Sequence, residues 1–272
     1  MEIPRGTYLS DTRPLFESRI VNGQLAELGQ FPYQVFFTGY RDDMRSIPIL
    51  TCGAVIIAER WIVTAAHCLF EDNNLDKILG SFVLKAGQIY TNKGSSYTQG
   101  ATVLTAQTHP HPDYNPTTLM NDIGLFHPFF GFDLLRDPCY VNAIALPSPN
   151  DFIASHVGEE LTISGFGRTA TDEPASERLL WATLQVIPHC SCQESYAPTL
   201  PSTAFCGQDK TSPISSTCRG DSGGPVSLKI KNIPTLVGIV SFGGTNCGTV
   251  PQGFTAVANF VNWISEMQAK HK

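Results

Sequence analysis

A glycine-rich segment at residues 220–225, Gly-Asp-Ser-Gly-Gly-Pro, holds a serine in surroundings that suit nucleophilic chemistry. A serine hydroxyl attacks a carbonyl only if its oxygen is exposed and a nearby base removes its proton. The glycines around Ser222 carry no Cβ, so the backbone can turn tightly and direct two N–H groups at one developing oxyanion. A glycine-rich turn is weak evidence alone, and the partners of Ser222 must come from elsewhere in the chain.

Two other segments supply such partners. His67 lies in the small-residue stretch Thr-Ala-Ala-His-Cys at residues 64–68, and Asp122 stands at the head of a short apolar run. A single histidine near a core strand is usually structural, and a single aspartate before a strand is usually a turn residue. All three together, in the order His, Asp, Ser, match one of the unrelated catalytic triads and exclude the orders of subtilisin and the α/β-hydrolases.

The elements that must position these residues are short strands. Apolar runs separated by Gly, Pro, Asn and Asp occur at residues 52–57, 81–84, 161–164, 183–187 and 236–240. Many short strands with turn signals are typical of β-sandwiches and barrels. A loop-like stretch at residues 128–140 divides the chain roughly in half, and helical spacing appears only near the end, at Phe260, Trp263, Ile264 and Met267. We therefore predict an all-β protein of two units with a terminal helix.

Composition narrows the class of protein. The 272 residues carry a net charge of −6 without a Lys/Arg cluster, which argues against nucleic acid or an anionic membrane as a partner. No apolar run reaches the roughly 18 residues that a membrane helix needs. Eight cysteines without a CxxC pair are typical of disulfides in an oxidising compartment, so we expect a secreted, extracellular protein. The sequence leaves open whether a signal peptide or a further module preceded Met1, since residues 1–6 lack an apolar core.

With these motifs the sequence resembles the chymotrypsin-like serine peptidases, and most of all the arthropod chymotrypsins and collagenolytic serine peptidases. The likeness runs from Ile20 to about Met267 and includes Ile-Val-Asn-Gly at residues 20–23 and Val-Ser-Phe-Gly at 240–243. It implies two six-stranded antiparallel β-barrels with the active site in the cleft between them. It also implies an activation propeptide at residues 1–19 and a peptidase domain at residues 20–272. Within that domain, the N-terminal barrel would span about 20–130, the C-terminal barrel about 141–258 and the terminal helix about 259–268.

The resemblance also implies residue roles. Ser222 is expected to be the nucleophile, His67 its general base, and Asp122 the group that orients the histidine. The N–H groups of Gly220 and Ser222 would form the oxyanion hole. The strand that pairs with the substrate backbone would be Ser241, Phe242 and Gly243, with Phe242 standing where the family usually has Trp.

The specificity pocket is expected to have Ser216 at its base, followed by Thr217, with Gly243 leaving one wall open. Because no acid is present to pair a buried Lys or Arg, we predict a chymotrypsin-like preference for aromatic or large aliphatic residues before the scissile bond. Elastase- or collagenase-like specificity is the alternative. Gln252 would partly fill the pocket; if the alignment slips by one, Gly253 takes that place and the pocket stays deep. Arg219 would rim the pocket or be a solvated surface residue.

The resemblance suggests the disulfides Cys52–Cys68, Cys192–Cys206 and Cys218–Cys247. Cys139 and Cys190 have no familiar counterpart and either form a fourth bridge, which we favour, or stay free.

We expect no cofactor and no metal ion. The stretch at residues 86–93 has no carboxylate where some relatives bind calcium. His109 and His111 stand in a His-Pro-His-Pro run without a third ligand, and His-Cys-Ser-Cys at residues 189–192 is better explained by disulfide cysteines.

The leading hypothesis is an active, digestive-type serine endopeptidase of the gut lumen or another extracellular space, a monomer that meets protein substrates and protein inhibitors. Cleavage after Arg19 by a trypsin-like protease would free the Ile20 amine to pair with Asp221. The rivals are a catalytically dead homologue that only binds partners and a regulatory cascade protease. The first usually loses a triad residue, and here all three are present.

Overall fold

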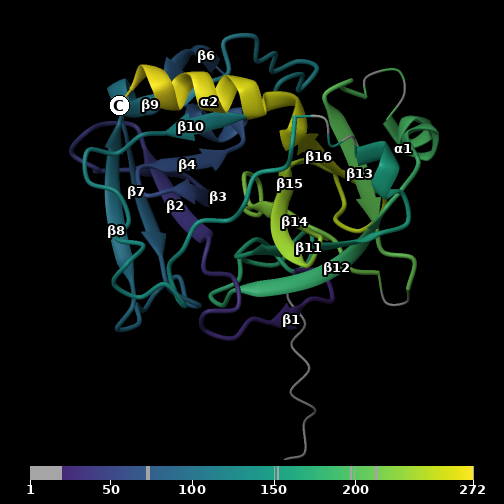
Figure 1. Cartoon of the computed structure of the whole chain (residues 1–272), viewed down its shortest axis with the longest axis horizontal. Coiled ribbons are helices and arrows are strands. Elements are labelled where there is room, and N and C mark those ends of the chain that lie inside the picture. The colour runs from purple at the N-terminus through teal and green to yellow at the C-terminus, as the bar shows by residue number, and fades with distance from the viewer. Residues whose placement is uncertain are drawn as a thin grey trace, which may run out of the picture.

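Two antiparallel sheets, each built mainly from one half of the chain, make up most of the computed structural model (Figure 1). The structure describes residues 20–271 except 72, 73, 150, 152, 197, 199, 212 and 213. The expected propeptide at residues 1–19, with Arg19, lies outside the described residues.

The N-terminal sheet has the strand order β8-β7-β2-β3-β4-β10-β9. These strands are β2 (Gln34–Tyr40), β3 (Pro48–Ala58), β4 (Trp61–Thr64), β7 (Ser81–Ala86), β8 (Gln99–Leu104), β9 (Thr108–Pro110) and β10 (Gly124–Phe126). One 3-10 turn, Thr105–Gln107, joins β8 to β9, so the chain itself connects the two edges of the sheet. Counted as one bent strand, β8 and β9 make this a six-stranded barrel. Strands β5 (Phe70–Glu71) and β6 (Asn74–Ile78) form a separate ribbon.

The C-terminal sheet has the order β1-β12-β11-β14-β15-β16-β13, and a further pairing of β12 with β13 closes six strands into a barrel. These strands are β1 (Gln24–Leu25), β11 (Glu160–Gly165), β12 (Leu180–Val186), β13 (Ala204–Gln208), β14 (Pro225–Ile230), β15 (Ile233–Phe242) and β16 (Gln252–Ala256). The all-β class with its two barrels is confirmed.

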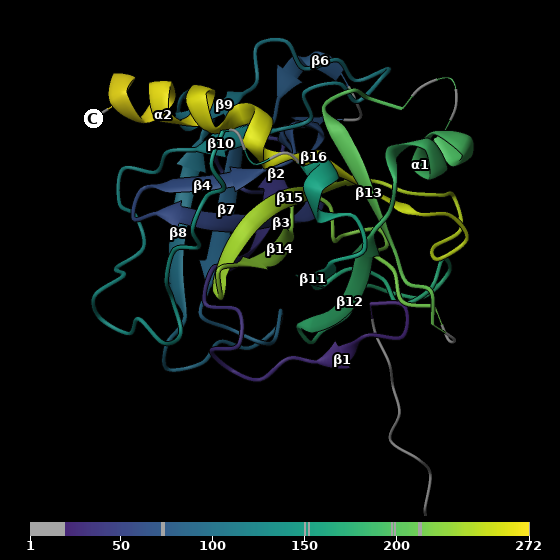
Figure 2. The same ribbon diagram turned by 45° about the vertical axis from the view of Figure 1, so that its right-hand side comes forward.

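A helix at the end of the chain packs on the first barrel, not on the second one that it follows. After a 3-10 turn, Val257–Phe260, the helix α2 (Val261–Lys270) runs past β9 and β10 in both views (Figures 1 and 2). Ile264 is fully buried in the N-terminal core, with Trp263 and Met267 packed beside it. The predicted terminal helix is therefore present, and its apolar stripe explains where it docks. No helix among the described residues is long and apolar enough to cross a membrane.

A second helix, α1 (His189–Tyr196), was not expected from the sequence. It has no clear apolar stripe, and only Cys192 among its residues is buried. A disulfide from Cys192 to Cys206 ties it to β13. Another 3-10 turn, Ile153–His156, precedes β11.

Each barrel has its own apolar core, and polar side chains join the two barrels. The Ser164 hydroxyl on β11 donates a 2.7 Å hydrogen bond to Gln34 Oε1 on β2. Tyr33 and Ser227 form another cross-barrel hydrogen bond of 3.3 Å. Because each partner is buried, losing one of them would leave an unsatisfied polar group, so these bonds help to hold the barrels in one relative position.

Three disulfides are present, Cys52–Cys68, Cys192–Cys206 and Cys218–Cys247, as the resemblance suggested. The favoured fourth bridge is not formed, because Cys139 and Cys190 are both free and exposed. Cys139 lies against the backbone at Gly29, where a Cβ added to Gly29 would sit 2.7 Å from its carbonyl oxygen. Cys190 belongs to α1 and is held beside β13 on the second barrel. Their separate anchors explain why the two thiols do not meet, since a disulfide needs its Cα atoms within about 7 Å.

Candidate active site

Strand pairing in the first barrel brings His67 and Asp122 together. Strands β4 and β10 are antiparallel, with Thr64 opposite Gly124. The chain leaves β4 at Thr64 and turns into a 3-10 helix, Ala66–Leu69, which carries His67. Asp122 lies just before β10 begins. The end of one strand and the start of its neighbour share one edge of the sheet, so the two side chains meet there.

The Asp122 carboxylate is fully buried and holds the histidine at two points. One oxygen accepts a hydrogen bond from the backbone N–H of His67 at 2.9 Å, and the other lies 2.8 Å from Nδ1 of the ring. A carboxylate can only accept, so the proton of this second bond belongs to Nδ1. Nε2 is then left as the basic nitrogen of the neutral ring, which is the tautomer that a general base requires.

The second barrel completes the surroundings of Asp122. Ser241 Oγ on β15 donates, at 2.5 Å, to the carboxylate oxygen that also accepts from His67 Nδ1. Thr255 Oγ1 on β16 donates to the backbone carbonyl of Asp122 at 2.8 Å. Sequence reasoning placed Ser241 only in the substrate-binding strand and did not find Thr255, because nothing local marks a residue that contacts a site 133 positions away.

The charge on Asp122 changes the basicity of His67. Burial by itself lowers the pKa of His67, but the neighbouring carboxylate and its hydrogen bond outweigh that effect, and the pKa is raised above its usual value of 6.5. The ring therefore binds a proton more readily than an ordinary histidine, which suits a group that must take one from a serine hydroxyl.

The segment carrying Ser222 packs closely against the first barrel and is also hydrogen-bonded to the second. The backbone N–H of Gly53 on β3 donates to the Ser222 carbonyl at 2.8 Å, and Gly223 N–H donates to Val240 at 2.8 Å. A Cβ at Gly223, whose φ is +77°, would lie 2.1 Å from the Thr64 hydroxyl. Only glycine fits there, so the close approach of this segment to residues 64–67 depends on it.

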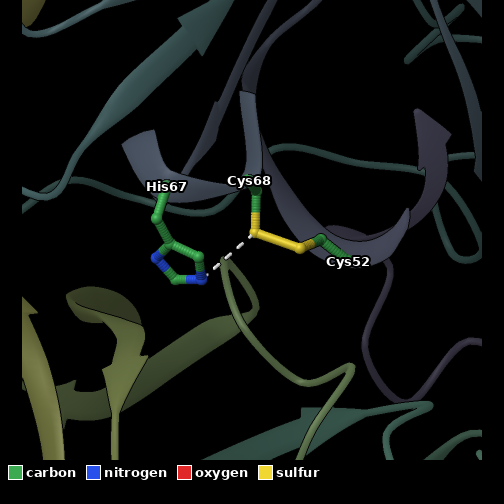
Figure 3. Close-up of side chains that lie close together, drawn as sticks. All are labelled: Cys52, His67 and Cys68. Carbon is green, nitrogen blue, oxygen red and sulfur yellow. Dashed lines mark hydrogen bonds between the residues drawn. A yellow bond between two sulfur atoms is a disulfide. The ribbon is translucent and has the colours of Figure 1, made fainter. Parts of the chain in front are cut away.

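The histidine ring itself faces the neighbouring disulfide. Nε2 of His67 lies 3.6 Å from Cys68 Sγ, which is bonded to Cys52 (Figure 3). Both sulfurs are held in the disulfide and are not thiolates, so this group of side chains is no metal site. Within the described residues no hydrogen bond joins Nε2 to Ser222 Oγ. Catalytic hydrogen bonds are often long or misaligned without substrate and tighten when it binds.

Two backbone donors next to Ser222 are unoccupied. The N–H groups of Gly220 and Ser222 donate to no other described residue, while Asp221 N–H between them donates to Cys218 at 3.0 Å. Gly220 has a φ of +98°, a conformation that side chains rarely adopt. The free pair is what an oxyanion-binding site requires.

The residues of the predicted activation switch lie in the second barrel. Ile20 is completely buried in its core, and Val21 forms an antiparallel bridge with Ser216. Asp221 is buried and accepts hydrogen bonds from the backbone N–H groups of Gly167 at 2.8 Å and Cys218 at 3.0 Å. Burial raises the pKa of Asp221 to about 7, although these two bonds lower it. No side-chain cation among the described residues pairs with this carboxylate.

A cavity of about 200 Å³ opens beside Ser222, where the specificity pocket is predicted. Its lining includes Ser222 and six of the seven residues predicted for the pocket: Thr217, Arg219, Ser241, Phe242, Gly243 and Gln252. Ser216, predicted at the base, is buried behind the lining, and its hydroxyl donates to the Thr217 carbonyl at 3.2 Å.

The alternative between Gln252 and Gly253 is decided by the strand register. Gly253 pairs with Phe242, and a Cβ on Gly253 would lie 2.1 Å from that ring, so Phe242 covers it. Gln252 points into the pocket instead. Its Oε1 accepts a 2.6 Å hydrogen bond from Thr217 Oγ1, and its Nε2 donates to Val250 at 2.9 Å. Hydrogen bonds thus hold both ends of the amide, and Gln252 forms part of the cavity lining.

Two β-barrels with a histidine, an aspartate and a serine at their junction form the arrangement of the chymotrypsin-like serine proteases. Residues 20–264 match the family described as Trypsin. The chain is 32% identical over 263 residues to Serine protease SP24D of Anopheles gambiae, covering 95% of this chain and 85% of that protein. It is also 32% identical over 255 residues to a Collagenase of Hypoderma lineatum, covering 93% of this chain and 88% of the other.

A solved structure described as "Structure of GrC" shares the fold, with a TM-score of 0.76 over 91% of this chain and 98% of that one, at 24% identity. The chain belongs to the trypsin family and is a serine protease, as the sequence motifs predicted. Membership implies protein substrates and protein inhibitors as partners.

Proposed function

We propose that the chain is a secreted endopeptidase that hydrolyses peptide bonds through an acyl-enzyme formed on Ser222. The observation that carries this proposal is the buried Asp122 holding the Nδ1–H tautomer of His67 beside the segment of Ser222. His67 Nε2 takes the serine proton during attack and then gives it to the leaving amine. The N–H groups of Gly220 and Ser222 stabilise the oxyanion. The three disulfides fit an oxidising, extracellular environment, and we propose a monomer.

The pocket favours large aliphatic side chains over aromatic ones and over cations. Gln252 shortens the cavity, which disfavours the rings of Phe and Tyr. The pocket lining contains no carboxylate to pair a buried Lys or Arg side chain, and an unpaired buried charge is costly. Arg219 on the rim adds attraction for acidic groups nearby. We therefore expect Leu and Met to be preferred before the scissile bond. Such a specificity is intermediate between chymotrypsin-like and collagenase-like.

Replacing Gln252 by glycine tests the role of the amide. Gln252→Gly removes the side chain that reaches Thr217, so the pocket deepens and peptides with Phe or Tyr should gain. We expect the ratio of kcat/KM for Leu over Phe peptides to fall by at least about ten-fold, the range that small changes of pocket volume produce. Matched peptide substrates with Leu, Met, Phe, Tyr, Lys and Arg measure it after activation. Asn259→Gly, outside this pocket, is the control. A dominant preference of the unchanged enzyme for Lys or Arg would refute this pocket.

The enzyme is made as a zymogen that is activated by cleavage after Arg19. The new ammonium group at Ile20 supplies the cation that the Asp221 carboxylate needs. While that partner is missing, the buried and ionised carboxylate of Asp221 lowers the stability of the folded chain. Because its pKa in the folded chain is raised to about 7, the contribution of this group to folding stability is fully present below pH 3.8 and is lost as the pH rises through 7. Pairing with the ammonium removes this cost and stabilises the Gly220 N–H in its present position, which the uncleaved chain holds only weakly, a local order–disorder switch.

Cleavage should raise kcat/KM by at least about 100-fold, because one oxyanion donor is worth roughly 10²- to 10³-fold. The full chain treated with catalytic trypsin should gain activity as N-terminal sequencing begins to read Ile-Val-Asn-Gly. Arg19→Gln should stay latent because trypsin does not cleave the peptide bond after Gln. Asp221→Asn should be cut and yet remain poorly active.

The pocket lacks an acid, so the pure protein should not activate itself, and a trypsin-like partner is required. Full activity of a chain that still starts at Met1 would contradict the switch. Rapid self-activation would contradict the pocket.

A further inference from the structure

Three histidines from distant parts of the sequence meet at the end of β10 remote from Asp122. His109 lies in β9, His127 directly follows β10, and His271 directly follows α2. Each offers a ring nitrogen, and these three atoms lie within 4.8 Å of one another. The sequence shows His109 only beside His111, without a third ligand. The fold turns His111 towards Trp263, at 4.9 Å between rings, and brings the other two histidines to His109.

Strand register and aromatic packing hold two of the rings. His109 pairs with Leu125, so His127, two residues further on, is its diagonal neighbour on the same face. The His127 ring stacks on Trp61 at 4.3 Å and 9° between planes. The His109 and His271 rings are 4.7 Å apart. Two members thus lie in a sheet strand or directly after one, and the third, His271, is the C-cap residue that follows the last turn of α2.

The site has the electronic character of a ligand set. Nε2 of His109 is buried and has no hydrogen-bond partner among the described residues. Burial, followed by the charges of His271, His127 and Lys270, lowers the pKa of His109 to about 4. Burial, Arg60 and His271 also lower the pKa of His127. Neutral imidazoles with free lone pairs are the form that coordinates metals, whereas protonated ones would repel each other and the metal.

We propose that His109, His127 and His271 are the ligands of a binding site for a transition-metal dication, and that this ion is Zn²⁺. Zn²⁺ prefers imidazole nitrogen in tetrahedral sites at about 2.0–2.1 Å, which places ligand nitrogens about 3.3 Å apart. The three nitrogens, now within 4.8 Å of one another, reach this spacing by rotation of the side chains, and water completes the fourth position. Arg60 and Lys270 oppose a dication, so the affinity is moderate.

The bound metal ties the end of α2 to β9 and β10. Figures 1 and 2 place this end of the helix over these two strands, on the first barrel. The chain's last helix, which follows the second barrel, thereby becomes cross-linked to the first. The site is separate from His67, so its effect is on stability and not on chemistry at Ser222.

Calorimetric titration of the untagged full chain with Zn²⁺ tests the proposal. We expect one site that weakens at least ten-fold in His271→Gln and in His109→Gln, the size of loss that even outer-shell changes cause. His111→Gln is the matched control, since it also packs beside α2 but lies outside the cluster, and it should bind as the parent does. Co²⁺ should give the intense visible bands of a tetrahedral site in the parent and lose them in His271→Gln.

Zn²⁺ should also raise the Tm of the parent and of His111→Gln in a concentration-dependent way, with a much smaller rise in His271→Gln. Unchanged affinity in both ligand variants would overturn the proposal. Binding that survives His271→Gln but disappears in His67→Ala would place the metal at the catalytic histidine and overturn it equally.

Discussion

Replacing the serine nucleophile, Ser222→Ala, should lower kcat of the activated enzyme by about 10⁶-fold, because the members of a catalytic triad act as one unit. The proton acceptor on His67 then has no hydroxyl to act on, and no acyl-enzyme can form. Labelling by a serine-directed phosphonate, followed by intact-mass spectrometry, should fall from one adduct per chain to none. Residual turnover should remain from the oxyanion donors and substrate binding.

Ser202→Ala is the control for this experiment. It removes an exposed hydroxyl that lies 3.6 Å from Met120 Sδ and is not part of the pocket lining. Its activity and labelling should match those of the parent. A Ser222→Ala variant with near-normal activity after matched activation would disprove the assignment of the nucleophile.

Asp122→Asn should lower kcat by about 10⁴-fold, with the fold retained. An amide can donate to Nδ1 where the carboxylate could only accept, so the ring is driven into the wrong tautomer and Nε2 carries the proton. The amide nitrogen would then stand where Oδ2 now lies, so the Ser241 hydroxyl, which donates to that oxygen at 2.5 Å, would rotate and accept a hydrogen bond from the amide instead. Circular dichroism should therefore be unchanged while turnover collapses. Asp113→Asn, an exposed change in the same loop, should leave turnover intact.

The same variant gives a pH signature. His67 must be neutral to act as a base, and its pKa is raised above 6.5, so kcat/KM of the parent should fall as pH drops through a value above 6.5. The Asp122→Asn substitution removes both effects that raise this pKa and leaves burial, which lowers it. The acidic limb of the profile should therefore move to lower pH. A limb that moves upward or stays in place would show that Asp122 does not set the basicity of His67.

Much of the candidate site was predictable because its signals are local. The glycines around Ser222 indicate a backbone conformation that other residues rarely adopt, and Gly220 and Gly223 do have positive φ. The His67 and Asp122 segments are recognisable from their immediate neighbours. Short apolar runs between turn residues, such as residues 52–57 in β3 and 81–84 in β7, identify strands from the local sequence.

Contacts between distant segments escaped sequence reasoning. Gln252 and Gly253 are adjacent, and only the β15–β16 register, with Phe242 covering Gly253, places the amide in the pocket. Cys139 and Cys190 have no familiar counterpart, and the sequence favours a bond between them because unpaired thiols are uncommon in secreted proteins. Whether two thiols meet depends on where their separate segments are anchored, and here both are free.

The sequence by itself determined the all-β class, the family and the candidates for the reacting side chains, because each depends on residue types within a few positions. Tertiary structure alone decided that Ser241 and Thr255 of the second barrel support Asp122 of the first. It also brought His271, at the end of the last helix, to His109. These contacts follow from how two cores and a terminal helix bury their apolar faces against each other, a condition on the whole chain that no short segment encodes.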